Sequence, residues 1–458
     1  MQAGQTKNGI GMTLSACLWL GLFPLMQFGT FSSITRDKWI CMYILTGVSL
    51  LCFLVDLCCR RLSRPRVFPL VTGALLLGWM TLSAFTSPYP GNPWWIGAGR
   101  REGLATQLAY YGLFFLFCCS RVRRGPVLFS AVAGLAVFTA VVVLQRAGKN
   151  PFGLYPGGHS FATAPGFQGT IGNVDVCSTY LLIVAGLAFP ALVDALRRVF
   201  HPSPAEPEAL PAGPENPVAV PKRKSRLLPL LAAAVLLLVL VVCAWLFYTM
   251  EVRFGLLTLA VLLVWTLVRF LPKKLWFPVL LLLMVLALAL VWYYPFTSVS
   301  TLNELHEILH GHIDYNYGTE RVGVWIYCAK LLSGGDHLLL GTGPDTFALR
   351  FNEFLNAYLK AHPDAPQLRY YYDSPHNEYI ALLLNCGIPA LLLFLVLVIG
   401  GCFGRPAWRD SVFAYGIQAL LSLSVCLVSP MFWVVNGMAW SMAPPGPQRP
   451  EKTEAAAS

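Results

Sequence analysis

Repeated runs of about twenty apolar residues limit how this chain can fold more than any other feature, because a helix needs roughly that length to cross a bilayer. Charged residues make up only 12% of the 458 residues, about half of the roughly 25% found in soluble domains. The sequence therefore predicts an all-α integral membrane protein with about 12 transmembrane helices and one large extracytoplasmic loop. The candidate spans are residues 11–30, 39–58, 68–86, 104–119, 126–145, 177–196, 227–249, 254–270, 276–296, 380–400, 412–429 and 431–443.

Lysine and arginine are concentrated in one alternate set of the loops that connect these spans. Because basic loops remain on the cytoplasmic side, we predict a multi-pass protein of the cytoplasmic membrane with both termini in the cytoplasm. These loops also explain the net charge of +11, so membrane lipid is the expected surrounding partner and no nucleic acid is required. The basic residues are Arg60, Arg61, Arg64, Arg66, Arg121, Arg123, Arg124, Arg197, Arg198, Lys222, Arg223, Lys224, Arg226, Arg269, Lys273, Lys274, Arg405 and Arg409.

Two long polar segments interrupt the apolar pattern. Residues 199–226 contain seven prolines and end in a basic cluster, a composition that predicts a disordered cytoplasmic linker. Residues 297–379 hold six of the eight histidines, and helix-like stretches at 321–332 and 346–360 flank a glycine- and proline-containing turn. We interpret this segment as a folded extracytoplasmic loop that carries the catalytic function. The predicted division is an N-terminal bundle of about six helices (1–198), the linker (199–226), transmembrane helices 7–9 (227–296), the catalytic loop (297–379), C-terminal transmembrane helices (380–443) and a cytoplasmic tail (444–458).

Four arginines and one histidine fall on the predicted outer side, at or near membrane boundaries. Arg253 lies in the short turn after the seventh span, Arg321 opens a helix of the long loop, and Arg100 and Arg101 lie in an earlier loop. Guanidinium groups bind phosphate oxygens with paired donors, although anchoring at the membrane interface is the alternative for each arginine. His376 lies where the long loop enters the tenth span. Its imidazole is suited to accept a proton, although the surrounding residues also suit a simple helix start.

A possible zinc motif lies in the same long loop. His306-Glu307-Ile308-Leu309-His310 fits H-E-x-x-H, with His312 and Asp314 as further candidate ligands. Gly311 interrupts the helix directly after the motif. We therefore interpret the motif as a solvated amphipathic face and predict no metal site. A membrane zinc protease is kept as the weaker alternative. Acidic residues are scarce within the spans, which argues against an ion-coupled transporter but leaves a lipid-linked oligosaccharide flippase as the other alternative.

Several motifs occur in order along the second half of the chain. They are Gly318-Thr-Glu-Arg321 with Trp325, then Leu340-Gly-Thr-Gly-Pro-Asp-Thr-Phe347, then Ser374-Pro-His-Asn-Glu-Tyr-Ile380 followed by Gly387. Gly169-Thr-Ile-Gly-Asn173 and Arg253 precede them. Together they resemble the O-antigen ligase and O-antigen polymerase family of membrane glycosyltransferases. Ala390 departs from the family pattern, which has Gly, Thr or Tyr at that position.

The resemblance implies a metal-independent glycosyltransferase without a cofactor. Its donor would be a polyprenyl-diphosphate-linked oligosaccharide. Its acceptor would be a hydroxyl of a glycan, lipid or protein on the outer face of the cytoplasmic membrane, in cell-envelope polysaccharide biosynthesis. By position, Arg253 and Arg321 match the family's diphosphate-binding arginines, and His376 matches the proposed general base. Arg100, Arg101, Asn377 and Asn173 are the further residues that we predict to bind substrate.

Overall fold

The computed structural model describes residues 9–201, 226–297 and 299–442, and almost all of its regular structure is helical. The first half contains α1 (Ile10–Cys17), α2 (Ile34–Cys58), α3 (Val67–Phe85), α4 (Leu104–Cys118), α5 (Arg124–Arg146) and α6 (Val174–Phe200). The short antiparallel strands β1 (Phe167–Gln168) and β2 (Gly172–Asn173) precede α6. The second half contains α7 (Leu227–Thr249), α8 (Arg253–Val268), α9 (Trp276–Tyr293), α10 (Ser300–Leu309), α11 (Arg321–Ser333), α12 (Phe347–Ala361), α13 (Glu378–Cys402), α14 (Arg409–Gln418) and α15 (Ser429–Trp440).

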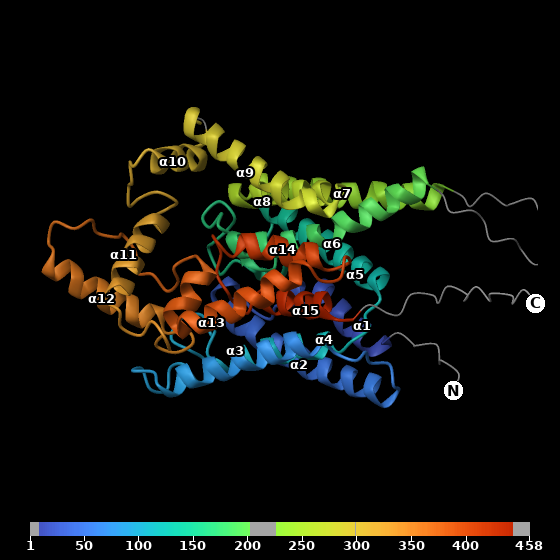
Figure 1. The fold of residues 1–458 in the computed structure, drawn as a ribbon, viewed down its shortest axis with the longest axis horizontal. Coiled ribbons are helices and arrows are strands. Elements are labelled where there is room, and N and C mark those ends of the chain that lie inside the picture. Colours follow the sequence, from blue (N-terminus) through green and yellow to red (C-terminus); the bar gives the residue numbers. More distant parts are fainter. Residues whose placement is uncertain (1–8, 202–225, 298, 443–458) are drawn as a thin grey trace, which may run out of the picture.

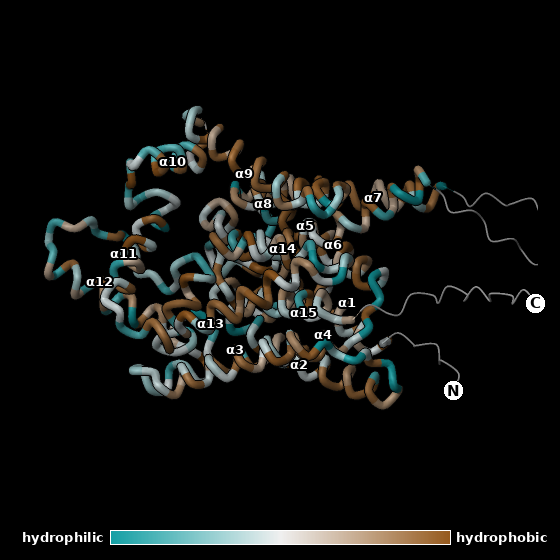
Figure 2. Tube along the Cα trace, viewed as in Figure 1, coloured by the Kyte–Doolittle hydropathy of each residue, from teal (hydrophilic) through white to brown (hydrophobic). Residues whose placement is uncertain are grey.

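Seven helices of the described residues are long and apolar enough to cross a membrane. They are Phe31–Cys58, Val67–Phe85, Arg124–Arg146, Val174–Phe200, Leu227–Thr249, Lys273–Tyr293 and Glu378–Cys402, and Ile10–Leu25, Leu104–Cys118 and Arg253–Val268 are shorter apolar helices. Figure 2 shows hydrophobic residues along these helices, and α9 exposes nearly all of its apolar side chains. Such exposure is stable when lipid covers the surface. The protein is therefore an all-helical, multi-pass membrane protein, as the sequence predicts.

The segments predicted as the first and the last two spans have a different form. After α1 the chain continues as a π-helical turn (Leu18–Leu22) and a 3-10 turn (Phe23–Leu25). The buried Lys38 ammonium donates to the two backbone carbonyls of Phe23 and Pro24, each at 2.7 Å. It thereby satisfies acceptors that a continuous helix would have used.

At the C-terminal end, the predicted spans 412–429 and 431–443 are replaced by α14 and α15. These helices have 10 and 12 residues, fewer than the roughly 20 that a lipid-exposed span needs. Residues 425–428 between them are irregular and buried. Irregular backbone is tolerated there because protein rather than lipid surrounds it.

Helix α13 is broken at Gly387, within a continuous apolar run. Gly387 has φ 80° and ψ 178°, and a side chain there would collide with the backbone carbonyl of Leu339. The break leaves the carbonyl of Asn385 available, and it accepts hydrogen bonds from the backbone N–H groups of Thr342 (3.0 Å) and Gly343 (2.7 Å). The turn at residues 338–343 is thus hydrogen-bonded directly to the broken helix.

The loops predicted to be cytoplasmic meet at one end of the bundle. The backbone N–H of Gly9 donates to the Arg121 carbonyl at 3.0 Å, and the Arg269 guanidinium binds Asp410 at 2.6 Å. Helices α10, α11 and α12 lie together at the opposite end from α1 (Figure 1). The predicted linker and tail fall mainly on residues 202–225 and 443–458, which lie outside the described residues, as do residues 1–8.

The segment predicted as the catalytic loop has a small hydrophobic core separate from that of the bundle. Its buried members come from α11, α12, the chain that leads into α13 and α13 itself: Val324, Tyr327, Cys328, Phe347, Phe351, Leu355, Tyr372 and Leu384. The helices predicted at 321–332 and 346–360 are confirmed as α11 and α12. This core fixes the position of the residues immediately before α13.

Candidate functional site

His376 lies two residues before α13, in a backbone turn that the surrounding residues hold in place. Its φ is 50°, its N–H donates to the Ser374 hydroxyl at 3.2 Å, and the Trp325 indole of α11 donates to the Pro375 carbonyl at 2.8 Å. Nδ1 of His376 is buried and has no hydrogen-bond partner among the described residues. The residue as a whole is half-buried, so part of the imidazole remains accessible.

Arg321 is the first residue of α11, and its side chain reaches across to α6. Its Nη2 donates to the Asp175 carboxylate at 2.7 Å. Asp175 belongs to the first turn of α6, where the Asn173 side chain caps the helix by accepting from the N–H groups of Asp175 (2.9 Å) and Val176 (3.3 Å). The side chains of Arg321 and Asp175 are 23% and 24% exposed, so this ion pair remains accessible to a ligand.

The charges around His376 come from three separate parts of the chain. Burial contributes most to lowering its pKa to about 4, and the guanidinium groups of Arg321 and Arg100 lower it further. The carboxylates of Asp175 and Asp373 act in the opposite direction. Arg321 and Arg100 therefore lie close enough to His376 for their charges to act on its imidazole, which is neutral at physiological pH.

Arg253 is the first residue of α8 and is exposed. In the turn that leads to α8, the Thr249 carbonyl accepts from the Arg146 guanidinium at 2.8 Å, and Arg146 also contacts the Gln168 side chain at 3.5 Å. Because β1 and β2 lead directly into α6, these contacts place the start of α8 at the same end of the bundle as the start of α6. Helices α6 and α8 also pack against each other.

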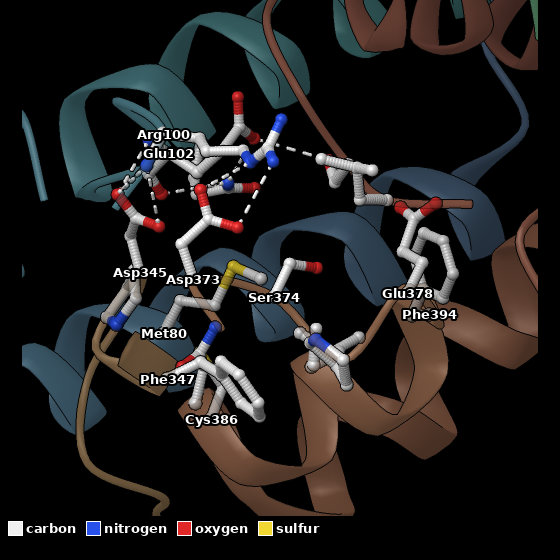
Figure 3. Close-up of a pocket in the computed structure, with 18 of the residues that line it drawn as sticks. Met80, Arg100, Glu102, Asp345, Phe347, Asp373, Ser374, Glu378, Cys386 and Phe394 are labelled. Atoms are coloured by element: carbon white, nitrogen blue, oxygen red, sulfur yellow. Dashed lines mark hydrogen bonds and ion pairs between the residues drawn. The ribbon is translucent and has the colours of Figure 1, made fainter. Parts of the chain in front are cut away.

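The other residues predicted to bind substrate each contact another part of the protein. Arg100 forms two hydrogen bonds with Asp373, from Nε at 2.9 Å and from Nη2 at 3.1 Å (Figure 3). Arg101 lies with its guanidinium carbon 5.5 Å from the centre of the Trp39 ring. The side-chain oxygen of Asn377 caps α13 by accepting from the Ile380 N–H at 3.0 Å, and Asn173 caps α6.

A cavity of about 80 Å³ lies beside Arg100, which corresponds to the volume of a few water molecules. It is lined by polar and apolar side chains from α3, α4, α12, α13 and α15 and from the loops between helices, including Arg100, Glu102, Asp373, Ser374 and Glu378 (Figure 3). Burial raises the pKa of Glu102 to about 8, and Tyr110 donates a hydrogen bond to this carboxyl group at 2.7 Å.

The H-E-x-x-H segment lies at the end of α10, where both of its histidines bond to backbone carbonyls through Nδ1. Nδ1 of His306 bonds to the Val291 carbonyl at 2.7 Å, and Nδ1 of His310 bonds to the His306 carbonyl at 2.8 Å. The Glu307 carboxylate contacts His312 at 2.8 Å. Within the described part of the chain, no group of three or more His, Cys, Asp or Glu residues is arranged to hold a metal ion.

The sequence analysis missed two acidic residues of this site. Asp175 follows an asparagine cap at the start of a predicted span, where an acidic residue is ordinarily explained by the helix dipole. Asp373 precedes the motif that contains His376. Neither signal identifies an arginine partner, because Arg321 is 146 residues from Asp175 and Arg100 is 273 residues from Asp373.

Comparison with known proteins identifies one related family. The family model of the O-antigen ligase matches residues 236–395, a segment that includes Arg253, Arg321 and His376. No curated protein matches the chain significantly. The resemblance stated from the sequence motifs is thus confirmed. The chain is a multi-pass membrane protein that carries an O-antigen ligase domain at residues 236–395.

Proposed function

We propose that the protein transfers an oligosaccharide from a polyprenyl diphosphate to a hydroxyl group of a glycan, lipid or protein. The reaction takes place on the outer face of the cytoplasmic membrane, in cell-envelope polysaccharide biosynthesis. The observation that carries this proposal is the grouping of His376 with Arg321 inside an O-antigen ligase domain. A base and a cation in one place match the two demands of the reaction.

Helix starts supply further positive potential at this end of the bundle. Arg321 opens α11, Arg253 opens α8, and Asp175 lies in the first turn of α6. The N-terminus of a helix carries a partial positive charge and free N–H groups, so it favours phosphate. The pairing of Asp175 with Arg321 indicates that this region already accommodates negative charge. A diphosphate placed near Arg253 and Arg321 would therefore meet both guanidinium groups and helix dipoles.

The proposed chemical step is a substitution at the anomeric carbon of the donor sugar. The acceptor oxygen forms a bond to that carbon, the bond from the carbon to the phosphate oxygen breaks, and the diphosphate leaves on its polyprenyl chain. His376 takes the proton of the acceptor hydroxyl, while Arg253 and Arg321 stabilise the charge that develops on the leaving diphosphate. The side chains of this chain supply both functions, so the proposed step is metal-independent.

The two ends of the bundle support an orientation for this site. The basic loops gather at the end opposite α10, α11 and α12. From the distribution of basic residues we infer that this end faces the cytoplasm, with His376 outside and, for an even number of spans, both termini inside.

Reconstitution tests the function directly. The purified protein in proteoliposomes receives a defined polyprenyl-diphosphate-linked oligosaccharide and an acceptor, and the product is measured by mass spectrometry. Arg253→Ala, Arg321→Ala and His376→Ala are each expected to abolish transfer without affecting membrane insertion. His362→Ala and Arg198→Ala are matched controls, because both residues are exposed, and Arg198 lies at the end of α6 that is opposite Asp175.

The same assay separates transfer from translocation. A protein that only moves the donor across the membrane would form no glycosidic product and would tolerate the loss of His376. Wild-type product formation in all three site variants would refute the site assignment.

A further inference from the structure

The loop at residues 96–102 is built around one carboxylate. Asp345 accepts hydrogen bonds from the backbone N–H groups of Gly99 (3.0 Å), Arg100 (3.0 Å) and Glu102 (3.2 Å). Its own backbone carbonyl accepts from the N–H of Ala98 at 3.1 Å. The fit is close, because a side chain at Gly99 would meet the Asp345 carboxylate. Asp345 therefore fixes the backbone that carries the Arg100 side chain.

Arg100 in turn holds the segment that contains His376. Two N–H groups on one edge of its guanidinium meet both oxygens of Asp373 (Figure 3). This paired arrangement fixes orientation as well as distance. Asp373 is three residues before His376, and between them the Ser374 hydroxyl accepts the N–H of His376. A displacement of Asp373 would be transmitted to the imidazole through this short turn.

The guanidinium groups of Arg321 and Arg100 differ in how many N–H groups remain available to a phosphate ligand. Arg321 uses one N–H for Asp175 in the contacts of the described residues, and a guanidinium has five N–H groups in total. Arg100 has already committed a paired edge to Asp373, and such an edge is what a phosphate would need for bidentate binding. Arg321 thus keeps four of its five N–H groups for a diphosphate, whereas Arg100 has two of its five held by Asp373.

We propose that Arg100 is a positioning residue that acts on His376 through Asp373, and that Asp345 holds Arg100 in place for this role. The inference deepens the proposed function and rests on it, and it replaces the expectation that Arg100 binds the donor. Asp345, Arg100 and Asp373 together form a brace between the loop before α4 and the residues before α13.

Kinetics distinguish positioning from donor binding. Arg100→Gln and Asp373→Asn are each expected to lower kcat at least about tenfold, with donor KM changed by less than about twofold, because the base is disturbed and the donor-binding arginines are not. The double variant Arg100→Asp with Asp373→Arg is expected to recover part of kcat. Arg36→Gln is the matched control, because Arg36 is an exposed arginine that also pairs with an aspartate. A rise in donor KM of tenfold or more in Arg100→Gln, with kcat unchanged, would overturn the proposal.

A second measurement needs no donor and so remains informative if the proposed transfer activity fails. Diethyl pyrocarbonate modifies neutral imidazole, and mass spectrometry of the His376 peptide follows this reaction as pH varies. The charged groups that act on His376 are Arg321, Asp175, Arg100 and Asp373. Removal of the Arg100 cation should move the titration of His376 to higher pH, and removal of the Asp373 anion should move it to lower pH.

A general loss of structure would not produce opposite shifts in the two variants. Arg100→Lys keeps the charge but not the paired edge, so it should retain the wild-type titration and still lose kcat. Shifts in the same direction for Arg100→Gln and Asp373→Asn, or no shift in either, would show that the brace does not control the surroundings of His376.

Discussion

Replacement of Arg321 by glutamine gives the sharpest test of the proposed site, because its effects on stability and on catalysis differ greatly in size. The ion pair between Arg321 and Asp175 is about one quarter exposed on each side, and exposed pairs contribute only about 0–1 kcal/mol to stability. The variant is therefore expected to fold. Loss of a group that stabilises transition-state charge typically costs about 2.7–4 kcal/mol, or about 10²–10³ in kcat. The catalytic effect should thus far exceed the effect on stability.

Arg321→Gln should also change how activity depends on pH. Burial contributes most to the low pKa of His376, about 4, and Arg321 is the next contributor. Without this cation the pKa rises toward the ordinary value of 6.5. At pH 5, about 90% of a group with pKa 4 is neutral, and this neutral fraction falls as the pKa rises. The acid limb of the residual kcat/KM should therefore move to higher pH in the variant.

The sign of the stability effect follows from the same shift. The pKa of His376 is lower in the folded protein than its ordinary value, so the folded state binds fewer protons than the unfolded state. The contribution of His376 to stability is complete above about pH 6.5 and is lost as the pH falls toward 4. Arg321→Gln should reduce this acid sensitivity, because in the variant the folded-state pKa of His376 lies closer to its unfolded-state pKa.

The assay is transfer in proteoliposomes between pH 4.5 and 8, with thermal unfolding measured at each pH. Burial also raises the pKa of Asp345 to about 6, but Asp345 is common to both proteins, so the comparison isolates Arg321. An acid limb at the same pH in wild type and variant, or a kcat within twofold of wild type, would refute the proposed coupling between Arg321 and His376.

Three further results are expected. Asn377→Ala should lower the free energy of unfolding by about 1 kcal/mol through loss of the α13 cap, and a rise in donor KM with unchanged stability would instead identify Asn377 as a substrate ligand. Gly341→Ala should destabilise the protein by at least about 1–3 kcal/mol, since φ is 66° and the added carbon meets the Asn385 carbonyl; a melting temperature equal to that of wild type would contradict the packing of this turn on α13. EDTA should leave transfer unchanged, and activity that is lost with EDTA and restored by a divalent cation would contradict a metal-independent reaction.

Much of the helical framework could be predicted from the sequence, because long apolar runs in a bilayer have few alternatives to a helix. The runs that contain α5, α7 and α9 illustrate this directly. The break in α13 could not be predicted in the same way. Gly387 and Pro389 lie in an apolar run, and glycine and proline are common in membrane helices. The cause of the break is a tertiary contact with the turn at residues 338–343.

The candidate site was predictable as a set of residues but not as a geometry. The motifs located Arg321 and His376, and the structure brings both into one electrostatic neighbourhood. The partners Asp175 and Asp373 depend on how distant helices pack, which residue patterns along one segment do not encode. The sequence alone did not separate helix capping from ligand binding at Asn173 and Asn377, because both functions favour the same side chain.

One consequence concerns the segment between Asp345 and Asp373. It starts at one aspartate of the brace, forms α12 and ends at the other aspartate of the brace. Arg100 binds the first of these aspartates through its backbone and the second through its side chain, so the two stems of this 346–372 excursion are fastened to the same residue. Its outer portion is therefore a natural unit for grafting between related enzymes. A chimera that retains the side chains packed against α11, such as Phe351, would exchange the exposed surface of this segment. The imidazole of His376 would keep its position.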